Sequence, residues 1–219
     1  MTSSQPGHFD YTLNEWTNEH FRKMLSIIFS DESVKNFIDL GANTGGVIKV
    51  LEHLGYVKKL DKIVCFEPDL ANFNFLVNIC NNIECEVICN NIGIYYGQTE
   101  ACVWGGGGGD GNVGGYFINT GRSMGDGNFV QYPGKVFKLD TAEKYIDFDI
   151  DVLKIDVEGA EINIFENSTI LKTAKYIILE WHFEVDEVPV FVKTNLENFD
   201  IIHSCVPHNH NFLLKNRTR

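Results

Sequence analysis

Two acidic residues stand where apolar runs end, at positions that could bind a nucleotide-like cofactor. The stretch Phe37–Gly46 is a short apolar run that carries Asp39 and then turns through glycines, and Glu67 ends the apolar run Lys62–Phe66. A segment with helical periodicity lies between the two runs, so the pattern indicates a strand–turn–helix–strand unit. Such a unit binds the adenosine half of a cofactor, and Glu67 is placed to accept hydrogen bonds from two ribose hydroxyls.

The glycine pattern of this turn favours a cofactor without phosphate. Gly41 and Gly45 supply the positive φ and the close backbone approach that the turn needs. Asn43, however, stands where the dinucleotide motif G-x-G-x-x-G has its middle glycine. Asp39 would also place an anion beside a pyrophosphate. A zwitterionic amino-acid tail tolerates that acid, so the residues indicate S-adenosylmethionine rather than a nicotinamide cofactor.

A third acidic strand end could remove a proton from an acceptor hydroxyl. Side chains alternate along the run Val152–Asp156, so Lys154 and Asp156 share one face. A buried lysine is costly unless it is paired, and Asp156 is the expected partner. His182 ends the next predicted strand and can titrate near neutral pH. We expect catalysis at Asp156, assisted by Lys154 and His182; the alternative is a purely structural ion pair.

Alternating strand and helix patterns predict a mostly parallel sheet with helices on both faces. One domain is expected over residues 1–219, with a helical cap within residues 1–30 that covers the entrance to the fold. Asp69 and Thr141 are the expected N-caps of the helices that follow them. The predicted strands are Phe37–Leu40, Ile63–Phe66, Glu86–Asn90, Ile92–Trp104, Lys135–Leu139, Val152–Ile155 and Tyr176–Trp181, with a terminal hairpin of Phe199–Cys205 and Asn211–Lys215. The predicted helices are Leu13–Phe29, Gly45–Gly55, one from Asp69, Ala142–Ile146, Glu158–Asn167 and Val188–Asn198.

Polar side chains end every predicted parallel strand. Because the carboxyl ends of parallel strands meet at one edge of a doubly wound sheet, these side chains are expected to line a ligand crevice. Each could instead be a helix cap or a turn residue, but the set as a whole predicts a binding site. The polar strand ends are Asp39, Glu67, Asn90, Asp156 and the pair Glu180 and His182.

Three strings, in this order, resemble the FkbM family of S-adenosylmethionine-dependent methyltransferases. They are Asp39–Gly45 (DLGANTG), Phe66–Pro68 (FEP) and Leu153–Glu161 (LKIDVEGAE), of which the last is the most specific. The likeness covers the chain from about Phe37 to Leu214. It implies a class I methyltransferase fold with seven strands, the last antiparallel. It also implies O-methylation of hydroxyls, often on sugars or glycosylated natural products.

The resemblance implies roles for single residues. Asp39 and Gly41 would border the methionine part of S-adenosylmethionine, Glu67 would bind its ribose, and Asp156 would lie closest to the transferred methyl group. Asn90 and Asn91 would lie near the adenine. The full set of expected cofactor-binding residues is Asp39, Gly41, Ala42, Asn43, Thr44, Gly45, Glu67, Pro68, Asn90, Asn91 and Asp156.

A glycine-rich tract, Gly105–Gly127, departs from the family pattern and is expected to face the acceptor. Loops of this length are usually functional lids or disordered. Aromatic and charged residues between glycines suit a carbohydrate, which stacks on rings and takes many hydrogen bonds; the alternative is an insertion without a role. The expected substrate-binding residues are Trp104, Tyr116, Arg122, Glu158 and Glu180.

Composition argues against several partners. A net charge of -12 with 18 Lys and Arg residues disfavours nucleic acid. No apolar run is long enough to span a membrane, and the polar start of the chain lacks a signal-peptide core. The six cysteines show no metal spacing and are expected to be reduced, buried thiols of a cytoplasmic protein. The oligomeric state does not follow from the sequence.

Other functions stay open at this level. Amino methylation of bases typically uses an Asn/Asp-Pro-Pro-aromatic string where this chain has Asp156–Glu158, which disfavours an N-methyltransferase. Asp39 and the glycine pattern disfavour a nicotinamide oxidoreductase, and the residues do not exclude a non-catalytic cofactor-binding module. No dedicated ligand cage is visible, so no metal is predicted, although Asp156, Glu158 and Glu180 carry oxygens of the kind that Mg²⁺ binds.

Overall fold

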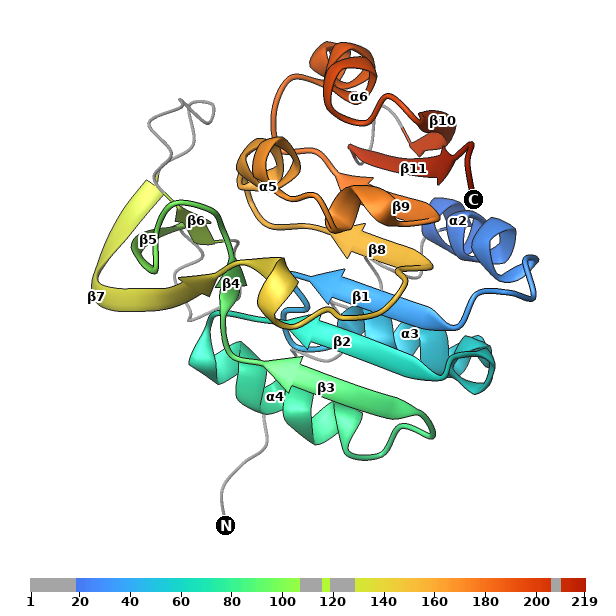
Figure 1. The fold of residues 1–219 in the computed structure, drawn as a ribbon. Coiled ribbons are helices and arrows are strands. Elements are labelled where there is room, and N and C mark those ends of the chain that lie inside the picture. The colour runs from blue at the N-terminus through green and yellow to red at the C-terminus, as the bar shows by residue number, and fades with distance from the viewer. Residues whose placement is uncertain (1–18, 107–115, 119–128, 206–209) are drawn as a thin grey trace.

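The computed structural model describes residues 19–106, 116–118, 129–205 and 210–219. Its main element is a seven-stranded sheet in the order β10-β11-β9-β8-β1-β2-β3 (Figure 1). The five central and edge strands from β9 to β3 are parallel, and β11 and β10 form the expected antiparallel hairpin at the other edge. The strands are β1 (Asn36–Leu40), β2 (Lys62–Phe66), β3 (Glu86–Asn90), β8 (Val152–Ile155), β9 (Tyr176–Glu180), β10 (Phe199–Cys205) and β11 (Asn211–Asn216).

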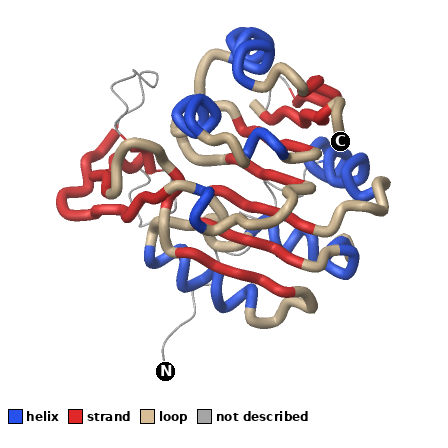
Figure 2. The backbone as a smooth tube through the Cα atoms, in the orientation of Figure 1, coloured by secondary structure: helices blue, strands red, loops and turns tan. Residues whose placement is uncertain are grey.

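Helices cover both faces of this sheet because alternate strand residues are apolar on both sides (Figure 2). Ile38 and Leu40 of β1 belong to one buried cluster, whereas Phe37 belongs to the other. Asp69 caps α4 as predicted, since its side chain accepts hydrogen bonds from the backbone N–H groups of Ala71 and Asn72. The helices are α2 (Glu19–Phe29), α3 (Gly46–His53), α4 (Leu70–Cys80), α5 (Glu161–Asn167) and α6 (Val188–Asn195), with short 3₁₀ turns η1 (Tyr56–Lys59), η2 (Ala142–Lys144), η3 (Leu171–Thr173) and η4 (Val185–Glu187).

A second, four-stranded sheet comes between β3 and β8 in the chain. Its order is β4-β7-β5-β6, and Figure 1 shows it beside the carboxyl ends of β1, β2 and β8. Two predictions were therefore wrong. The single strand over residues 92–104 is divided at Gly97, which has φ 91°, and the short strand over residues 135–139 is part of a longer one. The strands are β4 (Gly93–Ile94), β5 (Glu100–Gly106), β6 (Tyr116–Ile118) and β7 (Phe129–Asp140).

Five residues of the glycine-rich tract, 105–106 and 116–118, lie in strands rather than in a loop. Local composition predicts a loop, but β5 and β6 pair across it and β7 returns along β5, so their backbone groups are satisfied within a ladder. Two parts of the tract, residues 107–115 and 119–128, lie outside the described residues.

Local backbone conformation also corrected two helix ends. The helix predicted from Glu158 begins at Glu161, because Glu158 and Gly159 have left-handed φ values of 51° and 97°. The Thr141 side chain makes no capping bond to η2, which is shorter than the predicted helix. Asp140 Oδ1 instead accepts a hydrogen bond from the Thr141 backbone N–H at 2.9 Å.

The described part of the amino-terminal helix, α2, packs near the amino ends of the strands. The buried residues of α2, such as Met24 and Ile28, pack in the same cluster as Phe37 and Tyr176, which lie near the amino ends of their strands. Figure 1 accordingly shows α2 at the end of the sheet opposite the β4–β7 sheet. Residues 1–18 lie outside the described residues. Among the helices that are described, none has the length and apolar character needed to cross a bilayer.

Candidate functional site

The glycine turn after β1 is pressed against the end of β8. The backbone N–H groups of Gly41 and Ala42 both donate to the carbonyl oxygen of Phe66, at 3.0 Å each. Gly41 has φ 78°, and a Cβ atom at this position would lie 1.8 Å from the carbonyl oxygen of Asp156. Asn43 adopts φ 50° where the dinucleotide motif has glycine, a conformation that asparagine tolerates. Only glycine fits at position 41, as the turn chemistry predicted.

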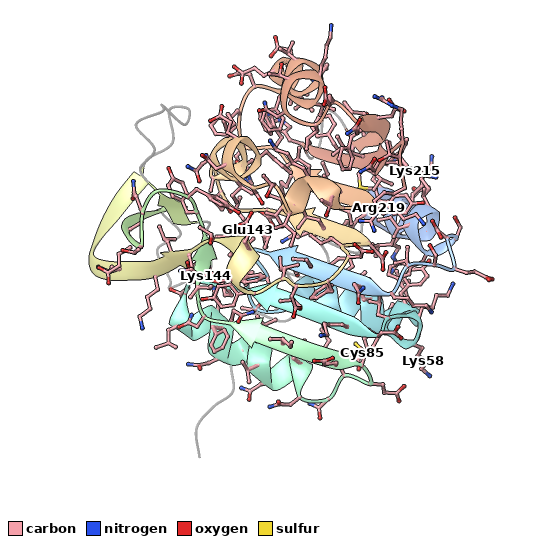
Figure 3. The ribbon with its side chains drawn as sticks, in the orientation of Figure 1. Lys58, Cys85, Glu143, Lys144, Lys215 and Arg219 are labelled. Carbon is pink, nitrogen blue, oxygen red and sulfur yellow. The ribbon has the colours of Figure 1, made fainter. Side chains whose placement is uncertain are left out.

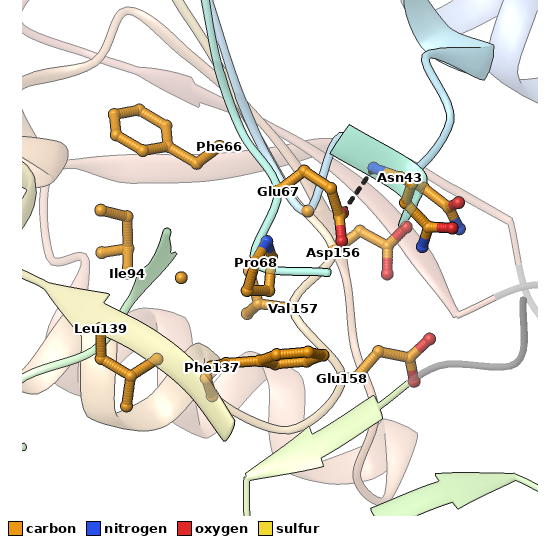
Figure 4. Close-up of a pocket in the computed structure, with 14 residues that line it drawn as sticks. Asn43, Phe66, Glu67, Pro68, Ile94, Phe137, Leu139, Asp156, Val157 and Glu158 are labelled. Atoms are coloured by element: carbon orange, nitrogen blue, oxygen red, sulfur yellow. Dashed lines mark hydrogen bonds between the residues drawn. The ribbon is translucent and has the colours of Figure 1, made fainter. Parts of the chain in front are cut away.

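Glu67 faces the same turn and holds it in place. Its Oε2 accepts a hydrogen bond from the Asn43 N–H and its Oε1 one from the Asp69 N–H, both at 2.8 Å (Figure 4). Its side chain is buried, and burial raises the pKa of Glu67 to about 7 even though both hydrogen bonds lower it. Each carboxylate oxygen has a second lone pair, so Glu67 can still accept a hydrogen bond from a ligand.

A pocket opens between this turn, the end of β8 and the second sheet. Its space, open mouth and adjoining solvent included, is about 700 Å³. Figure 4 shows Ile94, Leu139 and Phe137 toward one end of it, and Asn43, Asp156 and Glu158 toward the other. The pocket therefore has an apolar end and a polar end, with Glu67 between them. The lining residues are Gly41, Asn43, Phe66, Glu67, Pro68, Asn72, Gly93, Ile94, Phe137, Leu139, Asp156, Val157, Glu158 and Ala160.

Sequence reasoning missed the apolar wall of this pocket. Gly93 and Ile94 come from β4, and Phe137 and Leu139 come from β7, which pairs with β4. A Cβ atom on Gly93 would lie 2.9 Å from Leu139 Cδ2, so a side chain there would push this wall apart. Gly93, beside alternating apolar residues, was the signal for this wall that the sequence contained. The pairing of β4 with β7 could not be read from the sequence.

Six residues predicted to touch the cofactor do not line the pocket: Asp39, Ala42, Thr44, Gly45, Asn90 and Asn91. The side-chain amide of Asn90 donates to the Cys65 carbonyl, and that of Asn91 donates to the carbonyls of Glu67 and Pro68. These two asparagines therefore brace strand ends rather than contact the pocket. Gly45, with φ 91°, packs against α4, where a Cβ atom would lie 3.2 Å from Leu76 Cδ1.

Asp39 is fully buried behind the turn and pairs with a fully buried lysine. Lys154 Nζ lies 3.1 Å from Asp39 Oδ1 and 3.3 Å from Asp156 Oδ2, and it donates to the Gly41 carbonyl at 2.8 Å. Burial would lower the pKa of Lys154, but Asp156 and Asp39 outweigh it and hold that pKa above its usual value. Lys154 thus stays cationic and joins the end of β1 to the end of β8. The predicted pair with Asp156 is present, with Asp39 as a further member.

His182 joins three carboxylates beside the polar end of the pocket. Its Nε2 lies 3.3 Å from Glu158 Oε2 and 3.7 Å from Asp156 Oδ1, and its Nδ1 lies 2.6 Å from Glu161 Oε1. Burial alone would lower the pKa of His182, but the hydrogen bond to Glu161 and the neighbouring carboxylates raise it to about 10. The expectation that His182 titrates near neutral pH was therefore wrong. Glu161, whose side chain is fully buried, is the residue that sequence reasoning did not assign.

Two acids near His182, Glu158 and Glu180, have pKa values above that of an ordinary carboxyl group. Burial, opposed by His182, raises the pKa of Glu158 to about 7. Burial and then repulsion from Asp156 raise the pKa of Glu180 to about 8. Asp156, Glu158 and His182 each bring one ligand atom within 4.8 Å of the others. This group could hold a metal ion, so catalysis assisted by Mg²⁺ stays an alternative.

The predicted substrate residues of the glycine-rich region are placed only in part. Trp104 lies on β5, with Phe117 of β6 as its register partner, and Tyr116 of β6 pairs with Gly105. Arg122 lies outside the described residues. β7 lines the pocket and pairs with β5, but neither Trp104 nor Tyr116 is among the described residues that line it.

Comparison with known proteins places this site in a family. The sequence profile of the methyltransferase FkbM domain matches residues 39–213. In fold, the chain is similar to methyltransferase FkbM from Methylobacillus flagellatus KT, with a TM-score of 0.54 and 12% identity over 95% of this chain and 58% of that one. It is also similar to Sp1610 from Streptococcus pneumoniae, a suggested tRNA (m1A22) methyltransferase, with a TM-score of 0.50 and 10% identity over 89% of this chain and 69% of that one.

These likenesses concern the fold, and they confirm the class I methyltransferase architecture that the seven strands predicted. The chain spans 58% of the length of the Methylobacillus protein. No curated protein sequence matches the chain.

Proposed function

The chain belongs to the FkbM methyltransferase family, and we propose that it transfers a methyl group from S-adenosylmethionine to a hydroxyl of a sugar in a glycan or a glycosylated small molecule. The observation that supports this proposal most is the pocket that joins an apolar wall, a carboxylate and an acid-lined end. The cofactor, when bound, supplies a methyl group on a cationic sulfur that an oxygen nucleophile can accept.

The residues of the pocket fit the parts of this cofactor in order. The apolar end, with Pro68, Ile94 and Phe137, suits a flat base. Glu67 suits the two ribose hydroxyls, because its carboxylate has free lone pairs. The turn at Gly41, next to Asp156, suits a zwitterionic tail and leaves no room for a larger side chain. None of these contacts requires a phosphate, and no basic side chain lines the pocket.

Asp156 and Glu158, the two carboxylates that line the polar end, are the candidates to remove the proton from the acceptor. Asp156 lies 3.3 Å from Lys154 Nζ and 3.7 Å from His182 Nε2, so each of its two oxygens faces a cation. Glu158 has a pKa of about 7, which matches the general base that works best near neutral pH. We therefore propose that Glu158 removes the proton from the acceptor hydroxyl. Asp156, which the sequence favoured as the base, orients that hydroxyl.

His182 and Lys154 act through these acids. As a cation with a pKa near 10, His182 cannot accept the proton at neutral pH; it holds Glu158 and Asp156 in place. Lys154 has no access to solvent and fixes the ends of β1 and β8. Both are positioning residues rather than bases.

The acceptor class follows from charge. Asp156 and Glu158, the acids that line the polar end, can accept hydrogen bonds from neutral hydroxyls and offer no cation to a phosphate or a carboxylate. With a net charge of -12, the chain is also poorly suited to nucleic acid. An amine would be attracted to the same acids, so N-methylation is the rival outcome that the experiment has to separate.

Transfer of a labelled methyl group to a panel of neutral glycosides, amino sugars and RNA tests the proposal. Label in an oxygen-linked product of a neutral glycoside would support it, and label only on amines or RNA would overturn it. In the active assay, Glu158→Gln should lower the rate by about 10²–10⁴-fold, whereas Glu166→Gln, an exposed acid on α5, should not. If Glu158→Gln reacts as fast as the wild type, the base is Asp156 rather than Glu158.

A further inference from the structure

Three cysteines that are far apart in the sequence meet beneath the cofactor turn. Cys65 lies on β2, Cys80 ends α4 and Cys89 lies on β3. Their sulfur atoms all lie within 4.8 Å of one another. Cys65 and Cys89 are register partners on adjacent parallel strands, so their side chains leave the sheet on the same face, and α4 brings Cys80 to that face. The spacings in the sequence gave no sign of this group.

The geometry is close to that of a bound metal. Zinc–sulfur bonds are about 2.3 Å long, so two sulfurs that share one ion lie about 4 Å apart. The three sulfurs need to move by only a fraction of an ångström to contact a common ion. The thiolate is the form of cysteine that binds metals, and a bound cation stabilises that form.

We propose that Cys65, Cys80 and Cys89 form a binding site for one thiophilic d¹⁰ cation, Zn²⁺ or Cu⁺. Soft thiolate ligands select these ions over Mg²⁺ and Ca²⁺. Three sulfurs suffice for Cu⁺. Zn²⁺ needs a fourth ligand, for which a water can approach past Cys89, the half-buried member of the group. Binding releases the protons that the thiols hold.

The cysteine site is separate from the acids at the polar end of the pocket. It belongs to the same row of register partners as the buried ion pair of Asp39 and Lys154. Across the sheet, Cys89 is the register partner of Cys65, Cys65 that of Asp39, and Asp39 that of Lys154. A cation held by the three sulfurs would therefore lie in the same row as Asp39 and Lys154.

Metal titration of the reduced, full-length chain tests the proposal. Zn²⁺ and Cu⁺ are each titrated against a chromophoric chelator, and Co²⁺ serves as a probe because sulfur ligands give it a charge-transfer band that oxygen and nitrogen ligands do not. We expect one ion per chain with such a band. The proposal is overturned if neither Zn²⁺ nor Cu⁺ binds at one equivalent, or if Co²⁺ binds without the band.

Single serine variants identify the ligands. Cys89→Ser and Cys80→Ser should each weaken the affinity by more than about 100-fold, beyond what loss of an outer-shell partner costs. Cys85→Ser is the matched control, since Cys85, labelled in Figure 3, directly precedes β3 and is not one of the three residues whose sulfur atoms meet. Unchanged affinity in either test variant would overturn the site. The thermal unfolding of each apo variant is measured first. If one of the two test variants fails to fold, the affinity of the other still tests the site.

Discussion

Replacing Gly41 by alanine tests whether the contact between the β1 turn and the end of β8 shapes the site. A Cβ atom at position 41 would lie 1.8 Å from the Asp156 carbonyl oxygen, whereas real Cβ atoms essentially never come closer than 3.0 Å. The two backbones would therefore have to separate by about 1 Å or more. Such a shift breaks the hydrogen bond from the Asp156 N–H to the Leu40 carbonyl, or those from the turn to the Phe66 carbonyl.

A matched control separates this clash from the cost of the left-handed conformation. Gly55 has φ 74°, similar to the 78° of Gly41, but a Cβ atom there would meet nothing within 4 Å. Gly55→Ala should therefore lower the free energy of unfolding by about 1–2 kcal/mol, the cost of a left-handed alanine. Gly41→Ala pays the same cost and loses one or two hydrogen bonds worth about 0.5–1.5 kcal/mol each, for a total of roughly 1.5–5 kcal/mol.

Two measurements check this prediction. Urea unfolding gives the free energy of both variants against the wild type, and calorimetric titration with S-adenosylhomocysteine gives their affinities. Gly41→Ala should weaken the ligand while Gly55→Ala leaves it unchanged. If the two variants lose the same stability, or if folded Gly41→Ala binds the ligand as tightly as the wild type, the close approach of the two backbones does not form the site.

Three further outcomes are expected. Glu67→Ala should weaken S-adenosylhomocysteine by about 1.5–3 kcal/mol in calorimetry, the value of hydrogen bonds to a charged group; unchanged affinity in a folded variant would remove Glu67 from the ribose. Because the pKa of His182 is raised to about 10, its ion pairs stabilise the fold fully below pH of about 6.5 and lose this contribution as pH rises toward 10, at up to about 1.4 kcal/mol per pH unit. Glu161→Gln should bring that pKa down, and a His182 resonance that still titrates near 10 in NMR would contradict the role given to Glu161. The pH dependence of kcat/KM should rise through about 7 with Glu158 as the base and lose this limb in Glu158→Gln; an unshifted limb would assign it to another group.

Local signals were enough for the cofactor half of the site. A run of apolar residues, an acid and a glycine at the right spacing describe a strand and its turn, because only glycine tolerates positive φ and close contact together. Gly41 and Glu67 therefore lie where the sequence placed them. The place of Asn90 and Asn91 near the adenine stays a prediction: the sequence shows that an amide ends a strand, but not that this amide also donates to backbone carbonyls at the end of the neighbouring strand.

The alternation of residues along one strand predicted that Lys154 and Asp156 share a face, and the structure confirms their contact at 3.3 Å. It could not predict Asp39 as a second partner, since this depends on the register of β1 against β8. The protonation of His182 was misjudged for a related reason. A histidine titrates near neutral pH in water, but its pKa here depends on a buried glutamate, Glu161, that approaches from another element.

What the sequence determined by itself is the order of strands and helices, the turn after the first strand and the acids at the strand ends, because these depend on residues that are neighbours in the chain. The tertiary structure decided three things that depend on distant pairing. It placed β4 beside β7 to make the apolar wall of the pocket, surrounded His182 with carboxylates, and gathered Cys65, Cys80 and Cys89 under one helix. Each requires segments from separate parts of the chain to pack together, and local propensity carries no record of which segments those are.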